Sequence, residues 1–88
     1  MARQGTAKKR QKSHSLTESE YILINAMVSI AKVMGMEGEF SAAYEEKNEC
    51  LTIFLYEKPD HFFYLPSNFI DNKCWFDDLC NRMHKLVS

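Results

Sequence analysis

The first long apolar segment of the chain, from about Ser15 to Met34, has the spacing of an α-helix. Its main apolar stripe repeats every three or four residues and contains Leu23, Ala26, Met27, Ile30, Val33 and Met34. A second set of apolar side chains widens this stripe: Ile22, Ile24, Val28 and Ala31. Because only Asn25, Ser29 and Lys32 form a clear polar strip, this helix needs cover on more than one side.

Both ends of this helix carry sequence signals. Ser15 with Glu18, or equally Thr17 with Glu20, has the spacing of a capping box at the start. One of the two glycines that follow the last apolar position is expected to end the helix, because glycine readily adopts a left-handed backbone conformation.

Three short segments after the helix alternate between apolar and polar residues in the manner of β-strands. We expect the strands at residues 39–45, 50–56 and 61–65. The stretch "EKNE" separates the first two strands as a hairpin turn. Pro59 followed by Asp60 predicts the turn of the second hairpin.

An antiparallel meander of these strands has apolar side chains on both faces. One face gathers Phe40, Ala42, Tyr44, Leu51, Ile53 and Leu55, and the other gathers Cys50, Thr52, Phe54 and Tyr56. The third strand adds Phe63 with Leu65 to one face and Phe62 with Tyr64 to the other, and the pattern allows either assignment. The second face is then either covered by a helix or a second copy, or left exposed as a binding patch.

The C-terminal segment predicts a second helix, because Leu79, Met83 and Leu86 recur at helical spacing. Candidate N-caps precede it: Asn68, Asp71 and Asn72. The expected fold class is therefore α+β, a single small domain of order α-β-β-β-α. In it a three-stranded antiparallel meander packs on helices.

Charge divides the chain into two parts. Five of its basic residues lie within the first fourteen positions: Arg3, Lys8, Lys9, Arg10 and Lys12. This segment lacks apolar content, so we expect residues 1–15 to be a disordered basic N-terminal arm and residues 16–88 to be the folded domain. The remainder carries six basic and all twelve acidic residues, a net charge of −6.

Seven of the acidic residues surround the first two strands and their turns: Glu37, Glu39, Glu45, Glu46, Glu49, Glu57 and Asp60. Two interpretations fit this arrangement. The acids form a solvated rim that protects strand edges against aggregation, or they present an acidic surface to a basic partner.

The three cysteines, Cys50, Cys74 and Cys80, are odd in number and lack the spacing of a disulfide framework. We therefore expect a cytoplasmic protein in a reducing compartment. The longest apolar run, residues 21–36, contains polar residues and is too short to span a bilayer, so no membrane partner is expected.

No metal, cofactor or catalytic signature emerges from the sequence. Cys80 and His84 lie four residues apart on the second helix, but the spacing of a zinc site is absent. Asp77 and Asp78 are adjacent, so on a helix they point about 100° apart and do not face each other. We therefore expect no cofactor, no metal and no enzyme. Catalysis would require a site assembled from distant residues such as Cys50, His61 and Asp78.

The predicted α-β-β-β-α order resembles that of the double-stranded-RNA-binding domain. In that family, a basic run at the start of the second helix holds RNA phosphates. The matching stretch here is "DNKCWFDDL", in which Lys73 is the one basic residue and three residues are acidic. Negative charge therefore lies where phosphate would lie, and the resemblance extends to topology and not to function.

The surplus of apolar side chains predicts a protein that works in contact with a partner. We expect a small non-enzymatic interaction protein, a homodimer, that regulates or inhibits a larger protein machine by docking, as phage or viral accessory proteins often do. The expected protein interface contains Ile22, Ile24, Val28, Phe54 and Tyr56. The alternative is a nucleic-acid-binding protein that combines an aromatic platform on the sheet with the arm residues Arg3, Lys8, Lys9, Arg10 and Lys12.

Overall fold

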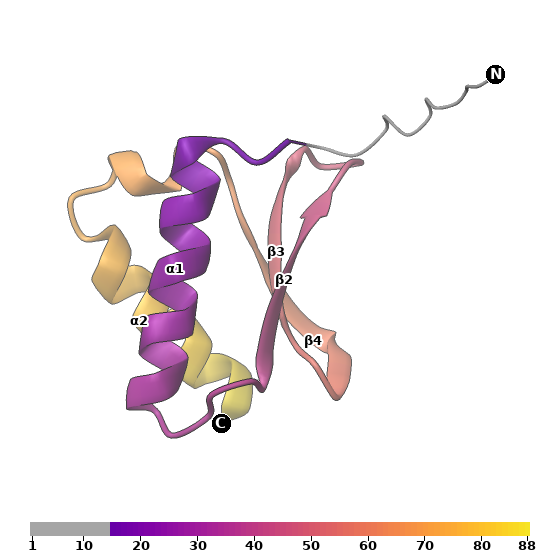
Figure 1. Ribbon diagram of the computed structural model, residues 1–88, viewed down its shortest axis with the longest axis vertical. Coiled ribbons are helices and arrows are strands. Elements are labelled where there is room, and N and C mark those ends of the chain that lie inside the picture. The colour runs from indigo at the N-terminus through magenta and orange to yellow at the C-terminus, as the bar shows by residue number, and fades with distance from the viewer. Residues whose placement is uncertain (1–14) are drawn as a thin grey trace, which may run out of the picture.

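The computed structural model describes residues 15–88, so the predicted basic arm lies outside the described residues apart from its last position. The elements are α1 (Glu18–Val33), β2 (Phe40–Glu45), β3 (Cys50–Leu55), β4 (Lys58–Leu65), the 3₁₀ turn η2 (Phe69–Asp71) and α2 (Trp75–Val87). Their order confirms the predicted α-β-β-β-α domain with a three-stranded antiparallel sheet (Figure 1).

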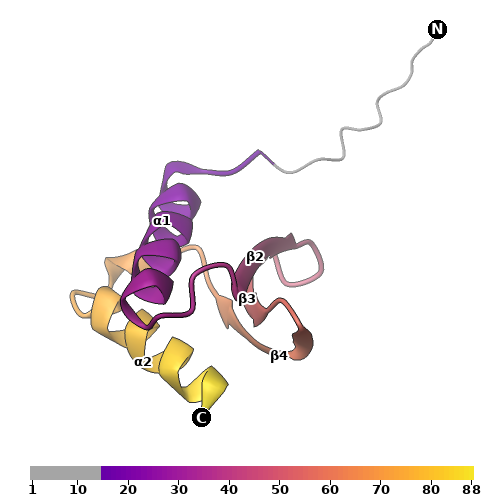
Figure 2. The same ribbon diagram turned by 60° about the horizontal axis from the view of Figure 1, so that its bottom comes forward.

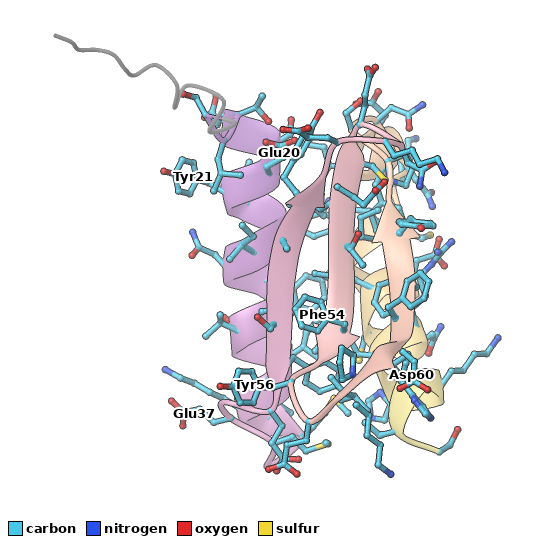
Figure 3. All side chains as sticks on the ribbon, turned by 90° about the vertical axis from the view of Figure 1, so that its right-hand side faces the viewer. Glu20, Tyr21, Glu37, Phe54, Tyr56 and Asp60 are labelled. Atoms are coloured by element: carbon cyan, nitrogen blue, oxygen red, sulfur yellow. The ribbon has the colours of Figure 1, made fainter. Side chains whose placement is uncertain are left out.

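The domain has two layers, with both helices on the same face of the sheet (Figures 1 and 2). Helix α1 contacts β2, helix α2 contacts β4, and the two helices contact each other. The interpretation in which one of the two predicted helices covers each face is therefore wrong, since both helices of residues 15–88 lie on one face. Within residues 15–88, no helix lies over the second face (Figure 3).

Helix α1 starts and ends with local hydrogen bonds that explain its bounds. The Thr17 backbone N–H donates to Glu20 Oε1 at 2.9 Å, and the Glu20 N–H donates to Thr17 Oγ1 at 3.2 Å, which forms the second of the two predicted capping boxes. At the other end Gly35 has a φ of 74°, and the Met36 N–H donates to the Ala31 carbonyl at 2.8 Å. This is the glycine-dependent closure that a left-handed residue provides.

The strand register decides which aromatic residues face the helices. Ile53 pairs with Phe63 and Leu51 pairs with Leu65, so these residues point into the core. Phe62 and Tyr64 therefore point to the opposite face. The core itself is built on six fully buried side chains: Leu23, Leu51, Ile53, Leu65, Leu79 and Met83.

The turn between β3 and β4 does not lie at Pro59 and Asp60 as predicted. Leu55 pairs with Lys58, which leaves only Tyr56 and Glu57 in the turn. Pro59 and Asp60 belong to β4, where the register with β3 shifts. Proline is tolerated there because β4 is an edge strand, and an edge residue can lack the backbone N–H that a central strand needs.

The second helix also starts later than the candidate N-caps predicted. Residues 69–71 form the 3₁₀ turn η2, and α2 begins only at Trp75, after Cys74. Asn72 instead fastens the connection, because its Oδ1 accepts from the Cys74 N–H at 3.1 Å and its Nδ2 donates to Asp78 Oδ2 at 2.9 Å. Neither helix in residues 15–88 has the length and apolarity needed to cross a membrane.

Candidate functional site

The uncovered face of the sheet, which we call the open face, is the most distinctive surface of the described chain. It is formed by the side chains that alternate with the core positions: Ser41, Ala43, Thr52, Phe54, Phe62 and Tyr64. Figure 3 looks onto this face, with Phe54 in front of the sheet and both helices behind it.

Three aromatic side chains lie side by side on the open face. Phe62 pairs with Phe54 across the two strands, and the rings of Phe62 and Tyr64 meet edge to face with their centroids 5.3 Å apart. Phe62 remains 44% exposed and Tyr64 remains 40% exposed. Such rings bury a large area at small entropic cost, so a partner that covers them gains affinity.

Phe54 and Tyr56, the two sheet residues of the predicted protein interface, occupy different positions in the structure. Phe54 is half-buried at the centre of the open face between Ser41 and Phe62. Tyr56 lies in the β3–β4 turn and is 70% exposed, with its backbone N–H donating to the Glu39 carbonyl at 2.9 Å. Tyr56 is therefore at the end of the sheet, near the labelled Glu37 (Figure 3).

The three predicted residues of α1 do not share one surface. Ile22 and Val28 are both exposed, but six helical positions place them about 120° apart around the helix, on either side of the polar strip. Ile24 is half-buried and packs against the core beside β2. The predicted set of five therefore splits between two flanks of α1 and the opposite side of the sheet.

The register identifies the two residues of the open face that sequence reasoning left undecided. Phe62 and Tyr64 were one of two alternative pairs, and only the pairing of β4 with β3 assigns them to the open face. The alternation of side chains within β4 shows that Phe62 and Tyr64 share a face. Deciding which face requires the position of at least one residue of β4 relative to β3.

The acidic residues lie at both ends of the sheet. Glu45 Oε1 accepts the Asn48 N–H at 2.7 Å and thereby closes the β2–β3 hairpin. At the same end, burial and the neighbouring Glu49 and Glu20 carboxylates raise the pKa of the Tyr44 hydroxyl. Asp60 lies at the other end and is highly exposed. The open face is thus apolar in the middle and negatively charged at its ends.

The residues considered for a metal are not assembled into a site. Cys80 Sγ lies 3.6 Å from His84 Nδ1 on α2, as their spacing predicts, and the same nitrogen lies 2.9 Å from the Cys80 carbonyl oxygen. Among residues 15–88, no three histidine, cysteine or acidic side chains are close enough together to hold a metal ion. The three thiols are free, with Cys50 buried and Cys74 exposed.

The residues considered for catalysis are also apart. Cys50 lies next to the β2–β3 hairpin, whereas His61 lies at the other end of β4, where its Nδ1 is 3.4 Å from Asp60 Oδ1 on the surface. Asp78 is on α2, behind the sheet, and bonds to Asn72. The five basic arm residues proposed for nucleic-acid binding lie outside the described residues.

No protein-family model, curated protein or solved structure matches this chain.

Proposed function

We propose that this chain is a small non-enzymatic interaction protein that docks onto a larger protein through its open face. The observation that supports this proposal most strongly is the row of Phe54, Phe62 and Tyr64 on a sheet face that neither helix covers. A protein that binds without chemistry acts by occluding its partner's surface or holding it in one state. Regulation or inhibition of the partner is therefore the effect we propose.

The anatomy of the open face fits a protein interface. Protein interfaces typically have an apolar aromatic centre inside a polar rim. Here the aromatic row occupies the middle, and exposed acidic residues such as Glu46 and Asp60 lie at the ends. The free thiols of Cys50, Cys74 and Cys80 fit a reducing compartment, and we propose a cytoplasmic location on that basis.

Nucleic-acid binding is the second candidate, because exposed aromatic rings on a sheet can stack unpaired bases. The charge of the described part weighs against it, since residues 15–88 carry six basic and twelve acidic residues. Phosphates approaching the aromatic row would meet acids at both ends of the sheet. Any attraction would have to come from the five basic residues at the N-terminus.

Replacing Phe62 and Tyr64 together by alanine is expected to abolish partner capture while leaving the fold intact. Each exposed aromatic anchor contributes about 1–2 kcal/mol, so the double variant should lose affinity by about two orders of magnitude. The measurement is quantitative mass spectrometry of proteins that co-purify with the tagged full chain from its source cell, followed by calorimetry with the purified partner.

Phe76→Ala is the matched control, because Phe76 is 46% exposed but lies on α2, on the other side of the molecule. It should retain the partner. If the double variant captures the same partner as the original chain, the open face is not the docking surface. Salt-sensitive recovery of nucleic acid in place of protein, lost when residues 1–14 are removed, would favour the second candidate.

A further inference from the structure

We propose that the groove between β2 and α1 binds an extended peptide segment of a partner, which pairs with the free edge of β2 as a fourth strand. The peptide would carry apolar side chains toward α1 and basic side chains at its ends. This groove lies along the outer edge of β2 and shares Ala43 with the open face, but none of the aromatic residues Phe54, Phe62 and Tyr64 lines it, so the inference does not depend on the function proposed above.

The two edges of the sheet differ in how well they resist an added strand. The strand order β2-β3-β4 makes both β2 and β4 edge strands. Strand β4 begins with Lys58 and Pro59 and has a shifted register, features that discourage further pairing. Strand β2, by contrast, has the sequence FSAAYE, without proline or lysine, and pairs with β3 in one unbroken register.

The backbone of β2 presents hydrogen-bonding groups to its outer side. Tyr56 N–H donates to the Glu39 carbonyl, which places residue 39 among those that bond toward β3. Because the bonded positions of an antiparallel pair alternate, the N–H and C=O of Ala42 point away from β3. Within residues 15–88, no backbone group outside the β2–β3 ladder bonds to Ala42.

Helix α1 provides the floor of the groove. Ile24 of α1 and Leu16, which precedes the helix, line it together with Ala42, Ala43 and Tyr44 of β2. The small side chains of the two alanines leave room for a neighbouring backbone. A peptide strand laid against β2 would therefore direct every second side chain onto the apolar flank of α1.

Two apolar side chains on the same flank of α1 as Ile24 are exposed in the described domain. Tyr21 is 56% exposed and Val28 is 40% exposed, and with Ile24 they follow the helical spacing of one stripe. Tyr21 points away from the body of the domain in Figure 3. A bound peptide would cover this stripe from the β2 side.

Charge indicates the character of the peptide. Glu37 and Glu39 precede β2, while Glu45, Glu46 and Glu49 end it or follow it. Lys47 is the one basic residue among these positions. Glu46 lines the groove itself, and acidic residues precede and follow β2, so this edge is complementary to a peptide with basic ends and disfavours a second copy of this acidic domain.

The test begins with a library of short random peptides selected on the immobilised full chain. The peptides enriched by this selection are expected to alternate apolar and polar residues and to have lysine or arginine near their ends. Binding of the enriched peptide to the isotope-labelled chain is then followed by NMR. The expected result is a saturable shift of the Ala42 amide and of the Ile24 and Val28 methyl groups. A copy of the peptide with alternate amides methylated should fail to bind, because it cannot complete the ladder.

Val28→Lys is the decisive variant, since its exposed position tolerates a lysine while the new charge repels a basic peptide. It should weaken binding by at least about tenfold. Val33→Lys is the matched control, because Val33 is 89% exposed and lies on the flank of α1 that faces α2, so it should bind normally.

Several results would overturn the proposal. They are the absence of peptide enrichment, shifts centred on Phe54 and Phe62 in place of Ala42, and unchanged binding by Val28→Lys. An Ala42 amide that is already protected in the free chain would mean that the edge is occupied by the N-terminal segment or by a second copy. Sedimentation of the full chain and of a chain lacking residues 1–14 would separate these two.

Discussion

Ile53→Ala is expected to lower the free energy of unfolding by about 3–4 kcal/mol, a large part of the stability of so small a domain. Ile53 is fully buried in the central strand, between Ala42 on β2 and Phe63 on β4. Both helices rest on the face to which it points. Its truncation leaves a cavity that strands held in register on both sides cannot close.

Urea denaturation followed by circular dichroism measures this loss. Ile22→Ala removes the same atoms from a position that is 38% exposed, so its cost should stay below about 1 kcal/mol. Equal losses for the two variants would mean that Ile53 is not at the centre of the core, and the two-layer arrangement would be wrong.

Cys50 is expected to react with a thiol-alkylating reagent at least about a hundredfold more slowly than Cys74 near neutral pH. Cys74 is exposed just before α2, whereas Cys50 is 6% exposed at the start of β3. Burial, together with the neighbouring Glu45 carboxylate, raises the pKa of the Cys50 thiol, so less of the reactive thiolate is present. The time course of labelling, read by peptide mass spectrometry, gives both rates.

Adding urea provides the control for this comparison, because unfolding should bring the Cys50 rate close to that of Cys74. The raised Cys50 pKa also makes the free energy of unfolding depend on pH. Its contribution to stability is fully present below the usual pKa of cysteine and is lost as the pH rises through the pKa of Cys50 in the folded chain. Rapid labelling of Cys50 in the native chain would contradict the burial of its side chain next to the β2–β3 hairpin.

The part of the fold that depends on local signals was predictable. The spacing of Thr17 and Glu20 gave one of two capping registers for α1, and the alternation of Leu51, Ile53 and Leu55 gave the core face of β3. The turn at Pro59 was predicted wrongly, because proline has two acceptable places, a turn or the start of an edge strand. A single sequence does not distinguish them.

The candidate surfaces depend on contacts between distant segments, and these were less accessible. The exposed position of Phe62 follows from its pairing with Phe54. Alternation alone does not fix this pairing, and a shift of one residue would turn Phe62 to the other face of the sheet. Helical spacing alone separates Ile22 from Val28, but which flank of α1 lies beside β2 and which lies beside α2 depends on how the elements pack. The surplus of apolar side chains was therefore visible in the sequence, whereas its division between two surfaces was not.

The most direct test of the uncovered aromatic face is the attenuation of aromatic NMR signals by a soluble paramagnetic agent in the free, full-length chain. The two-layer fold predicts strong attenuation for Phe62 and Tyr64 and little for Phe40 and Phe69, which are each 7% exposed. In nuclear Overhauser spectra of the same chain without the agent, the Phe63 ring should show cross-peaks to helix side chains and the Phe62 ring should show none. Protection of Phe62 and Tyr64 equal to that of Phe40 in a monomeric sample would contradict an open face.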